Sequence, residues 1–270
     1  MYLGVDVGGT KTLLAVFDGN GKVVFEHKIG TNKDYIKFLA DVSKIVSPEI
    51  KKFGVMEACC ALPGRINRRL GLGVSFGNLD WHNVPIKEDL KKLLGGVPVV
   101  IENDANLAGL SEALLVHKKY KIVLYLTFST GVGGGIITNG KIDATFEDFE
   151  PGQMVIFHEG KLQKWEDFAS GKALKKRYGK IAADINDATT WRLYSADLAI
   201  GVQELLAVVQ PDVVIVGGGV GSHFEKFSAY LEGELQKLEN PLVPIPPIIK
   251  ARRPEEAVIY GCYDFIRQQN

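Results

Sequence analysis

The residues best suited to chemistry near the N-terminus form the segment DVGGTK at residues 6–11, which follows a short apolar run. A turn that contains Gly8 and Gly9 exposes backbone N–H groups suited to phosphate oxygens, and the Asp6 carboxylate suits the magnesium ion that accompanies a nucleotide. The segment is not a Walker loop, because it lacks the Gly-Lys-Ser/Thr ending. It is not a dinucleotide fingerprint either, because such a fingerprint is followed by a helix and none is expected here. It therefore predicts a phosphate-binding turn, although Asp6 could serve only to stabilise the turn.

A second chemical group is the polar segment ENDAN at residues 102–106. The apolar run at 97–101 predicts a strand before it, and the apolar residues 107–116 predict a helix after it. Strand, polar cluster and helix form the arrangement in which α/β sheets present catalytic groups. Asp104 could accept a proton from a reacting hydroxyl group. It could also cap the following helix, and the two roles are compatible.

The elements around these segments occur twice. The first round is a strand, the turn at residues 8–10 and a return strand, which predict a β-hairpin. A similar strand at 121–128, the loop STGVGGG at 129–135 and a return strand follow roughly 120 residues later, near the spacing of two domains. A third glycine-rich loop, at 217–221, follows an apolar strand at 213–216. The pattern indicates two related lobes, each with a phosphate loop, and chance similarity of two hairpins is the alternative.

The composition is that of a globular protein with no net charge at pH 7. Of the 270 residues, 46% are hydrophobic, and 32 acidic residues balance 32 basic ones. This balance gives no basic surface for nucleic acid or an acidic membrane, and it is compatible with self-association. No apolar run reaches the ~20 residues of a membrane span, and no signal peptide is evident. The three cysteines do not form a disulfide framework, so we expect a reduced, cytoplasmic protein.

Five segments in order resemble the ROK sugar kinases, within the superfamily of actin, hexokinase and the heat-shock-70 ATPases. They are the first phosphate motif at 6–11, the sugar-side loop at 78–85, the catalytic segment at 102–106, the second phosphate motif at 129–135 and the adenosine motif at 214–220. The resemblance implies an α/β, two-lobed actin-like (ribonuclease H-like) fold, with duplicated mixed β-sheet domains flanked by helices and a cleft between the lobes. It places the smaller lobe at 1–106, completed by the C-terminal helix at 255–270, and the larger lobe at 107–254.

The resemblance also implies roles for individual residues. Asp104 is the catalytic base, and Asp6 holds Mg²⁺, through water. The residues expected to bind ATP are Asp6, Gly8, Gly9, Thr10, Lys11, Thr130, Gly131, Gly133, Gly217 and Gly218. The residues expected to bind the sugar are Gly64, Asn78, Asn103, Asp104, Glu150, Gln153 and Glu166.

The sugar side departs from the family pattern. Many ROK kinases carry a Glu-x-Gly-His motif and clustered cysteines that bind zinc, whereas this chain has Glu150-Pro151-Gly152-Gln153 and no cysteine at 154–175. Because such a site needs thiolates, we expect no zinc. Carboxylates and amides at Glu150, Gln153 and Glu166 suit the hydroxyl groups of a neutral sugar. A solvated helix acid is the alternative for Glu166.

The expected activity is ATP-dependent phosphorylation of a primary hydroxyl group of a hexose, with glucose as the first candidate. Polyphosphate is an alternative donor, and fructose, mannose or an N-acetylhexosamine is an alternative acceptor. A non-catalytic sugar-binding regulator is the alternative of another class, but such relatives carry an N-terminal helix-turn-helix, for which the hairpin that begins at Tyr2 leaves no room. The expected partners are the sugar and a second copy in a homodimer, with neither nucleic acid nor a membrane.

Overall fold

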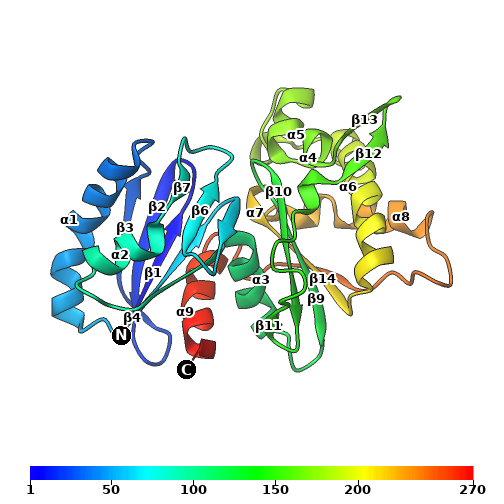
Figure 1. Cartoon of the computed structure of the whole chain (residues 1–270). Coiled ribbons are helices and arrows are strands. Elements are labelled where there is room, and N and C mark those ends of the chain that lie inside the picture. The colour runs from blue at the N-terminus through cyan, green and yellow to red at the C-terminus, as the bar shows by residue number, and fades with distance from the viewer. Residues whose placement is uncertain (270) are drawn as a thin grey trace. The chain divides into compact units, whose positions relative to one another are not determined.

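The computed structural model describes residues 1–269 and divides the chain into two compact units (Figure 1). Unit 1 contains Met1–Ser111 and the C-terminal segment that begins at Glu256, and unit 2 contains Glu112–Glu255. The first division falls inside the helix α3 (Asp104–Leu114), five residues beyond position 106. That these units are the lobes of an enzyme stays a prediction.

Unit 1 is built on a five-stranded sheet with the order β3-β2-β1-β4-β8. Its strands are β1 (Tyr2–Val7), β2 (Lys11–Phe17), β3 (Val23–Gly30), β4 (Glu57–Leu62) and β8 (Val99–Asn103). β1 pairs antiparallel with β2, which confirms the predicted hairpin, and β1, β4 and β8 are parallel. A three-stranded sheet of β5 (Arg65–Asn67), β6 (Leu72–Ser75) and β7 (His82–Val84) belongs to the same unit.

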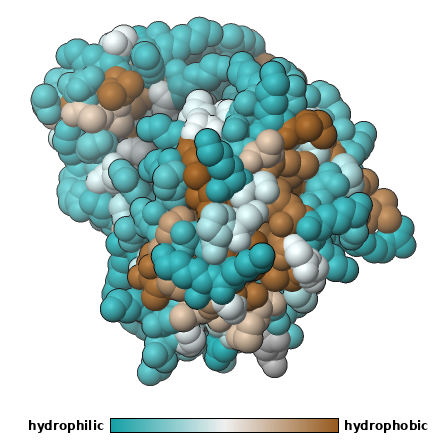
Figure 2. All heavy atoms as spheres, turned by 90° about the vertical axis from the view of Figure 1, so that its left-hand side faces the viewer, coloured by the Kyte–Doolittle hydropathy of each residue, from teal (hydrophilic) through white to brown (hydrophobic). Residues whose placement is uncertain are grey.

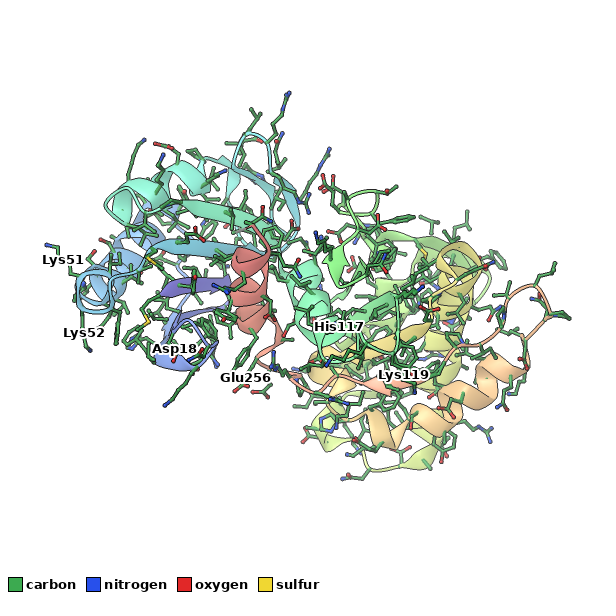
Figure 3. All side chains as sticks on the ribbon, turned by 90° about the horizontal axis from the view of Figure 1, so that it is seen from below. Asp18, Lys51, Lys52, His117, Lys119 and Glu256 are labelled. Atoms are coloured by element: carbon green, nitrogen blue, oxygen red, sulfur yellow. The ribbon has the colours of Figure 1, made fainter. Side chains whose placement is uncertain are left out.

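The helices of unit 1 are α1 (Tyr35–Phe53), α2 (Ile86–Leu93), the part of α3 up to Ser111, and α9 (Ala257–Gln269). The Asp34 carboxylate begins α1 by accepting two backbone N–H groups, and Gly54, with φ of 59°, ends it. Lys51 and Lys52 (Figure 3) lie in its last turn, where cations stabilise the helix dipole. α9, red in Figure 1, packs against β1 and β4, so the far end of the chain completes unit 1.

Unit 2 repeats the topology of the first sheet. The strand order is β11-β10-β9-β14-β15, with β10 antiparallel to β9 and with β9, β14 and β15 parallel. The strands are β9 (Ile122–Phe128), β10 (Val132–Thr138), β11 (Lys141–Ile142), β14 (Val213–Gly217) and β15 (Ile248–Lys250). Both sheets thus join three antiparallel strands to two parallel ones, which agrees with the duplicated mixed sheets that the family resemblance implies.

The helices of unit 2 cover this sheet and carry much of its buried aromatic core. They are α4 (Glu166–Ala169), α5 (Gly171–Tyr178), α6 (Ala188–Val209), α7 (Gly218–Gly221) and α8 (Ser228–Gln236), with short 3-10 turns η1 (Pro151–Gln153), η2 (Ala182–Asp184) and η3 (Phe224–Lys226). The sequence predicts one helix over 165–178, which is wrong at one point. Ser170 is extended and its hydroxyl oxygen caps α5, so the segment forms two helices. β12 (Val155–His158) and β13 (Lys161–Lys164) form a separate hairpin.

The surface agrees with the mixed composition. Hydrophilic side chains cover most of the face shown in Figure 2, and smaller hydrophobic areas lie between them. Within residues 1–269, none of the helices combines the length and the apolar character that crossing a bilayer would require.

Candidate functional site

Three acidic residues of unit 1, Asp6, Glu102 and Asp104, lie at one edge of its sheet. β1, β4 and β8 run parallel, and their register aligns Asp6 with Ala61 and Ala61 with Glu102. Their carboxyl ends therefore meet at the same edge, where catalytic groups of α/β sheets lie. Two strand spacings, about 9.6 Å, separate β1 from β8. Asp104 follows β8 directly, so the edge that carries Asp6 also carries Asp104.

The N-terminus of α3 is capped by the side chain of Asn103. Asn103 Oδ1 accepts the backbone N–H groups of Ala105 and Asn106 at 2.9 and 3.2 Å. Asp104 Oδ1 accepts only the N–H of Ala105 among these, at 2.7 Å. Asn103 thus performs the capping that the sequence could equally assign to Asp104. Its Nδ2 also donates to the carbonyl oxygen of Gly64 at 3.2 Å, which brings two expected sugar-binding residues into contact.

A buried ion pair that no sequence motif indicates fixes Glu102, the residue before Asn103. Glu102 is 3% exposed, and Arg68 binds its two carboxylate oxygens through Nε at 2.8 Å and Nη2 at 2.6 Å. Asn106 Nδ2 donates to the same carboxylate at 3.0 Å. These bonds hold the connection from β8 to α3, and hence the backbone that carries Asp104. No local signal links Arg68 to Glu102, because the pairing depends on the tertiary fold.

The glycine turn of unit 1 is closed by its own backbone. Gly8 donates its N–H to the carbonyl oxygen of Lys11 at 3.0 Å. Thr31, directly after β3, donates its hydroxyl to Gly8 O at 2.7 Å and its N–H to Thr10 O at 3.0 Å. Thr10 and Lys11 are exposed. Thr31 is a further supporting residue that the motif does not include, since it follows the next strand, β3.

Gly9 brings the predicted sugar-side loop next to this turn. A Cβ placed on Gly9 would lie 2.8 Å from Cβ of Asn78, so a larger residue would displace one of the two segments. The expected phosphate and sugar residues of unit 1 therefore lie beside one another. Burial raises the pKa of Asp6 from 3.8 to about 6, with the nearby Lys28 acting in the opposite direction.

The second loop lies at the corresponding edge of unit 2. It connects β9 to β10, and Ser129 O accepts the N–H of Gly171 at 2.7 Å. A Cβ on Gly131 would lie 2.9 Å from Oε2 of Glu166, which places that carboxylate directly against the loop. Thr130 is exposed beside Gly131. The sequence predicts that Gly133 belongs to the loop, but in the structure Gly133 lies within β10.

The expected sugar residues of unit 2 also form one group. Gln153 Nε2 donates to Glu166 Oε1 at 2.7 Å. Burial raises the pKa of Glu150, and the nearby Glu166 and Asp148 raise it further. The structure thus brings Glu150, Gln153 and Glu166 together next to the loop that contains Gly131. An amide and two carboxylates are an acceptor-rich set that suits sugar hydroxyl groups.

The expected adenosine motif is only partly a loop. Gly217 ends β14 and Gly218, with φ of 81°, begins the short helix α7, so a loop over 217–221 is wrong. A Cβ on Gly218 would lie 2.5 Å from Thr127 Oγ1 and 2.7 Å from Phe128 O. The two glycines therefore lie against the carboxyl end of β9, beside the start of the second phosphate loop.

No cluster of three or more His, Cys, Asp or Glu side chains within residues 1–269 is arranged to hold a metal ion. Cys59, Cys60 and Cys262 are buried and free, and burial raises the pKa values of Cys59 and Cys60. His158 contacts Asp197 and Gln163.

Several known sugar kinases resemble this chain over nearly its whole length. A family model described as "ROK family" matches residues 2–269. The chain is 28% identical to an N-acetyl-D-glucosamine kinase of Haemophilus influenzae, with 97% of each chain covered. It is 26% identical to a glucokinase of Streptomyces coelicolor, with 99% of this chain and 98% of the relative covered. A solved ROK family glucokinase from Streptomyces griseus, in complex with glucose and AMPPNP, has a TM-score of 0.84 at 24% identity, with 99% of each chain covered.

Proposed function

Because the chain belongs to the ROK family, we propose that it is a sugar kinase that transfers the γ-phosphoryl group of ATP to a hydroxyl group of a hexose. The observation that carries the proposal lies in unit 1. A carboxylate, Asp104, and a phosphate-type glycine turn lie at the same edge of one sheet, as the register of β1, β4 and β8 requires. Phosphoryl transfer needs this combination of a proton acceptor and phosphate donors more than it needs covalent chemistry.

Asp104 would take the proton of the attacking sugar hydroxyl. Its backbone is fixed by the Arg68–Glu102 ion pair, and capping of α3 falls mainly to Asn103. A carboxylate so held can accept a proton at the sugar without reorganising the helix. Asn103 and Gly64 would orient the same sugar, since they already bind each other.

ATP would be bound by the glycine turns. Gly9, Thr10 and Lys11 would donate to phosphate oxygens in unit 1, and Gly8, whose N–H is bound to Lys11 O, would hold the shape of the turn. Thr130, Gly131 and Gly133 would donate to phosphate oxygens in unit 2, with Gly217 and Gly218 beside the adenosine. The oxygen donor of Asp6 fits Mg²⁺, but one carboxylate makes an incomplete site, so water and phosphate oxygens would complete it. Mg²⁺ supplies charge neutralisation on the phosphates when bound.

Glucose is the first candidate for the acceptor and N-acetylglucosamine the second. The relatives that match most of the chain are named for both sugars. Glu150, Gln153 and Glu166 would accept and share the hydroxyl protons of either. Polyphosphate stays an alternative donor. The proposal includes a homodimer, which light scattering at several concentrations tests.

A donor–acceptor matrix tests the activity. The purified protein is incubated with Mg²⁺ and one of glucose, N-acetylglucosamine, mannose, fructose or N-acetylmannosamine, with ATP, GTP or polyphosphate as donor. Formation of sugar phosphate with ATP and one of the first two sugars supports the proposal. A protein that binds a sugar by calorimetry but transfers phosphate from none of the donors is a sugar-binding regulator, and the kinase proposal is then wrong.

A further inference from the structure

The helix that carries Glu166 cannot hold its position alone. α4 has four residues, which is too short for a helix to be stable by itself. It is fixed from α6 by two hydrogen bonds. Trp165 Nε1 donates to Asp197 O at 3.3 Å, and Tyr194 Oη donates to Ala169 O at 2.6 Å. The position of the Glu166 carboxylate thus depends on the part of α6 around Asp197.

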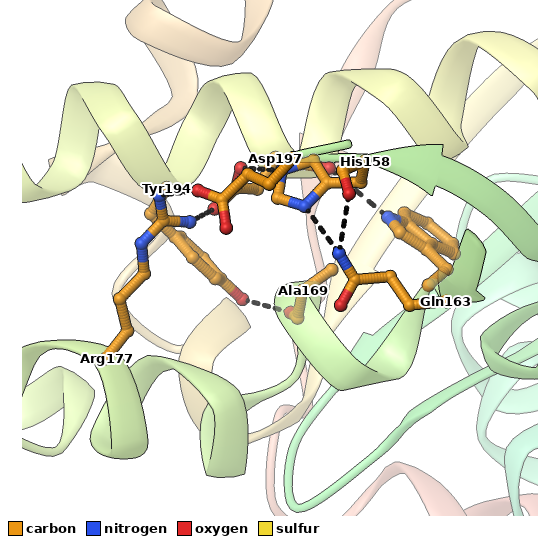
Figure 4. A network of polar contacts seen from close by, with 8 residues as sticks. His158, Gln163, Ala169, Arg177, Tyr194 and Asp197 are labelled. Atoms are coloured by element: carbon orange, nitrogen blue, oxygen red, sulfur yellow. Dashed lines mark hydrogen bonds and ion pairs between the residues drawn. The ribbon is translucent and has the colours of Figure 1, made fainter. Parts of the chain in front are cut away.

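His158 adds a third connection between the same two helices. Its ring stacks on Phe168 of α4, with centroids 3.9 Å apart and an interplanar angle of 3°. Its Nε2 lies 2.9 Å from Oδ1 of Asp197 on α6 (Figure 4). The imidazole therefore connects the Asp197 side chain to the helix that carries Glu166.

The hydrogen bonds define the protonation of this histidine. Gln163 Nε2 donates to the carbonyl oxygen of His158 at 3.0 Å, and the same nitrogen lies 3.0 Å from Nδ1 of the ring. Because an amide nitrogen only donates, Nδ1 must accept, and the proton is at Nε2. In this tautomer His158 Nε2 donates to Asp197 Oδ1. The charge of Asp197 is balanced by Arg177, whose Nη1 lies 2.7 Å from Oδ2.

The hairpin that supplies His158 has few other contacts on its outer side. Val155, Phe157 and Leu162 project from one face of the hairpin β12–β13, since Phe157 pairs directly with Leu162. They are 64%, 68% and 70% exposed. The hairpin is therefore attached by its inner face, where Ile156 packs against the core and His158 and Gln163 form the polar contacts.

A role in stability alone does not account for Asp197. The residue is 5% exposed, and burial raises its pKa while Arg177 and His158 lower it. Buried ion pairs gain little net stability, because desolvation offsets the attraction, and in some proteins they select one arrangement of the fold. Asp197 makes three contacts, with His158, Arg177 and Trp165, and two of these partners lie against or next to α4.

We propose that Asp197 is a positioning residue for sugar binding, whose side chain acts through His158 to place the Glu166 carboxylate against the loop that contains Gly131. The inference rests on the proposed function, in which Glu166 binds the sugar. Asp197 itself touches neither substrate in this account.

The first test separates the two substrates. Asp197→Ala removes both side-chain bonds, whereas Asp197→Asn retains an oxygen that can accept from His158. With glucose or N-acetylglucosamine as the probe, whichever the wild type phosphorylates, Asp197→Ala should raise KM for the sugar at least tenfold. KM for ATP should change less than twofold, and Asp197→Asn should show a smaller increase. An unchanged sugar KM in Asp197→Ala, or an equal rise in both KM values, overturns the proposal.

Asp212→Asn is the matched control. Asp212 lies in the same unit, and its carboxylate accepts the backbone N–H groups of Lys121 and Ile122 at 2.7 and 2.9 Å, at the start of β9. Like Asp197, Asp212 accepts two hydrogen bonds through its carboxylate, but its partners lie at β9 and not at α4. We expect both KM values of this variant to stay within twofold of the wild type. A tenfold rise in its sugar KM would show a general effect of loosening the unit and would overturn the specific role of Asp197.

A double-mutant cycle tests the route through Glu166. If Asp197 acts by placing Glu166, then Asp197→Ala adds less than threefold to the sugar KM of Glu166→Gln. Multiplication of the two single effects contradicts that route. Independently, ¹⁵N NMR should show the Nε2–H tautomer for His158, assigned from a His158→Gln variant. The Nδ1–H tautomer or a charged ring at pH 7 would overturn the contact described here.

These outcomes separate the two proposals. A wild-type protein that neither binds nor phosphorylates a sugar refutes the proposed function, and the role of Asp197 in sugar binding with it. An active wild-type kinase with an unaltered sugar KM in Asp197→Ala refutes only the positioning role.

Discussion

Burial disfavours the charged form of the Asp6 carboxylate, and the resulting loss in the free energy of unfolding can be measured. The pKa of Asp6 is raised from 3.8 to about 6, mainly by burial. A difference of one pKa unit corresponds to about 1.4 kcal/mol, so two units correspond to about 3 kcal/mol. We therefore expect Asp6→Asn to raise the free energy of unfolding at pH 7 by up to about 3 kcal/mol. The same variant should lose Mg²⁺-dependent kinase activity.

The dependence of this gain on pH has a defined sign. The folded protein holds the proton of Asp6 more tightly than the unfolded chain, so the stability contribution of Asp6 is complete below pH 4. It decreases as the pH rises to about 6, where the folded-state pKa lies, and it is constant above that. The difference between Asp6→Asn and the wild type should therefore be small at pH 4, grow between pH 4 and 6, and then stay level.

Urea unfolding followed by tryptophan fluorescence, in EDTA at pH 4 to 8, measures this difference. Asp18→Asn is the control of opposite sign. Asp18 (Figure 3) accepts the N–H groups of Asn20 and Lys22 at 2.8 and 3.0 Å, which lowers its pKa. Its contribution is present above pH 4 and is lost as the pH falls through the folded-state pKa, so its replacement should destabilise the protein at pH 7. An Asp6→Asn variant less stable than the wild type at pH 7, or a gain independent of pH, would refute the reasoning.

Three further predictions follow from the contacts. Gly131→Val should displace the Glu166 carboxylate and raise KM for ATP and for the sugar at least tenfold; steady-state kinetics with unchanged values would count against the loop's role. Arg68→Met leaves the buried Glu102 unpaired and should cost about 3 kcal/mol in urea unfolding, and a neutral effect would contradict it. Gly261→Ala places a methyl group against the backbone of α3 and should cost at least about 1–3 kcal/mol; a variant with wild-type Tm would disprove that close packing.

The sequence predicts those parts of the site that depend on local chemistry. The hairpin at the N-terminus and the similar hairpin of unit 2 follow from apolar runs broken by glycines. The loop expected at 129–135 is shorter in the structure, because β10 begins at Val132. Asp6 and Asp104 lie at the same edge because parallel strands place their carboxyl ends together. This relation requires only the strand order.

Other features depend on tertiary contacts and could not be predicted. Asn103 and Asp104 are both favoured helix caps, and only the geometry shows that Asn103 accepts two N–H groups. The break at Ser170 interrupts a sequence whose pattern continues as a helix on both sides. Arg68 and His158 bind partners 34 and 39 residues away, which no motif relates.

The assignment of Asp104 as the proton acceptor is the central claim, and its most direct test is phosphate transfer by Asp104→Asn. Transfer of the γ-phosphate from labelled ATP to glucose and to N-acetylglucosamine is measured beside nucleotide binding by calorimetry. Asp41→Asn, an exposed acid on α1, is the control and should retain full activity. We predict that Asp104→Asn lowers kcat by roughly 10²–10⁴-fold while ATP affinity changes less than twofold. Turnover within a few-fold of the wild type would contradict the account.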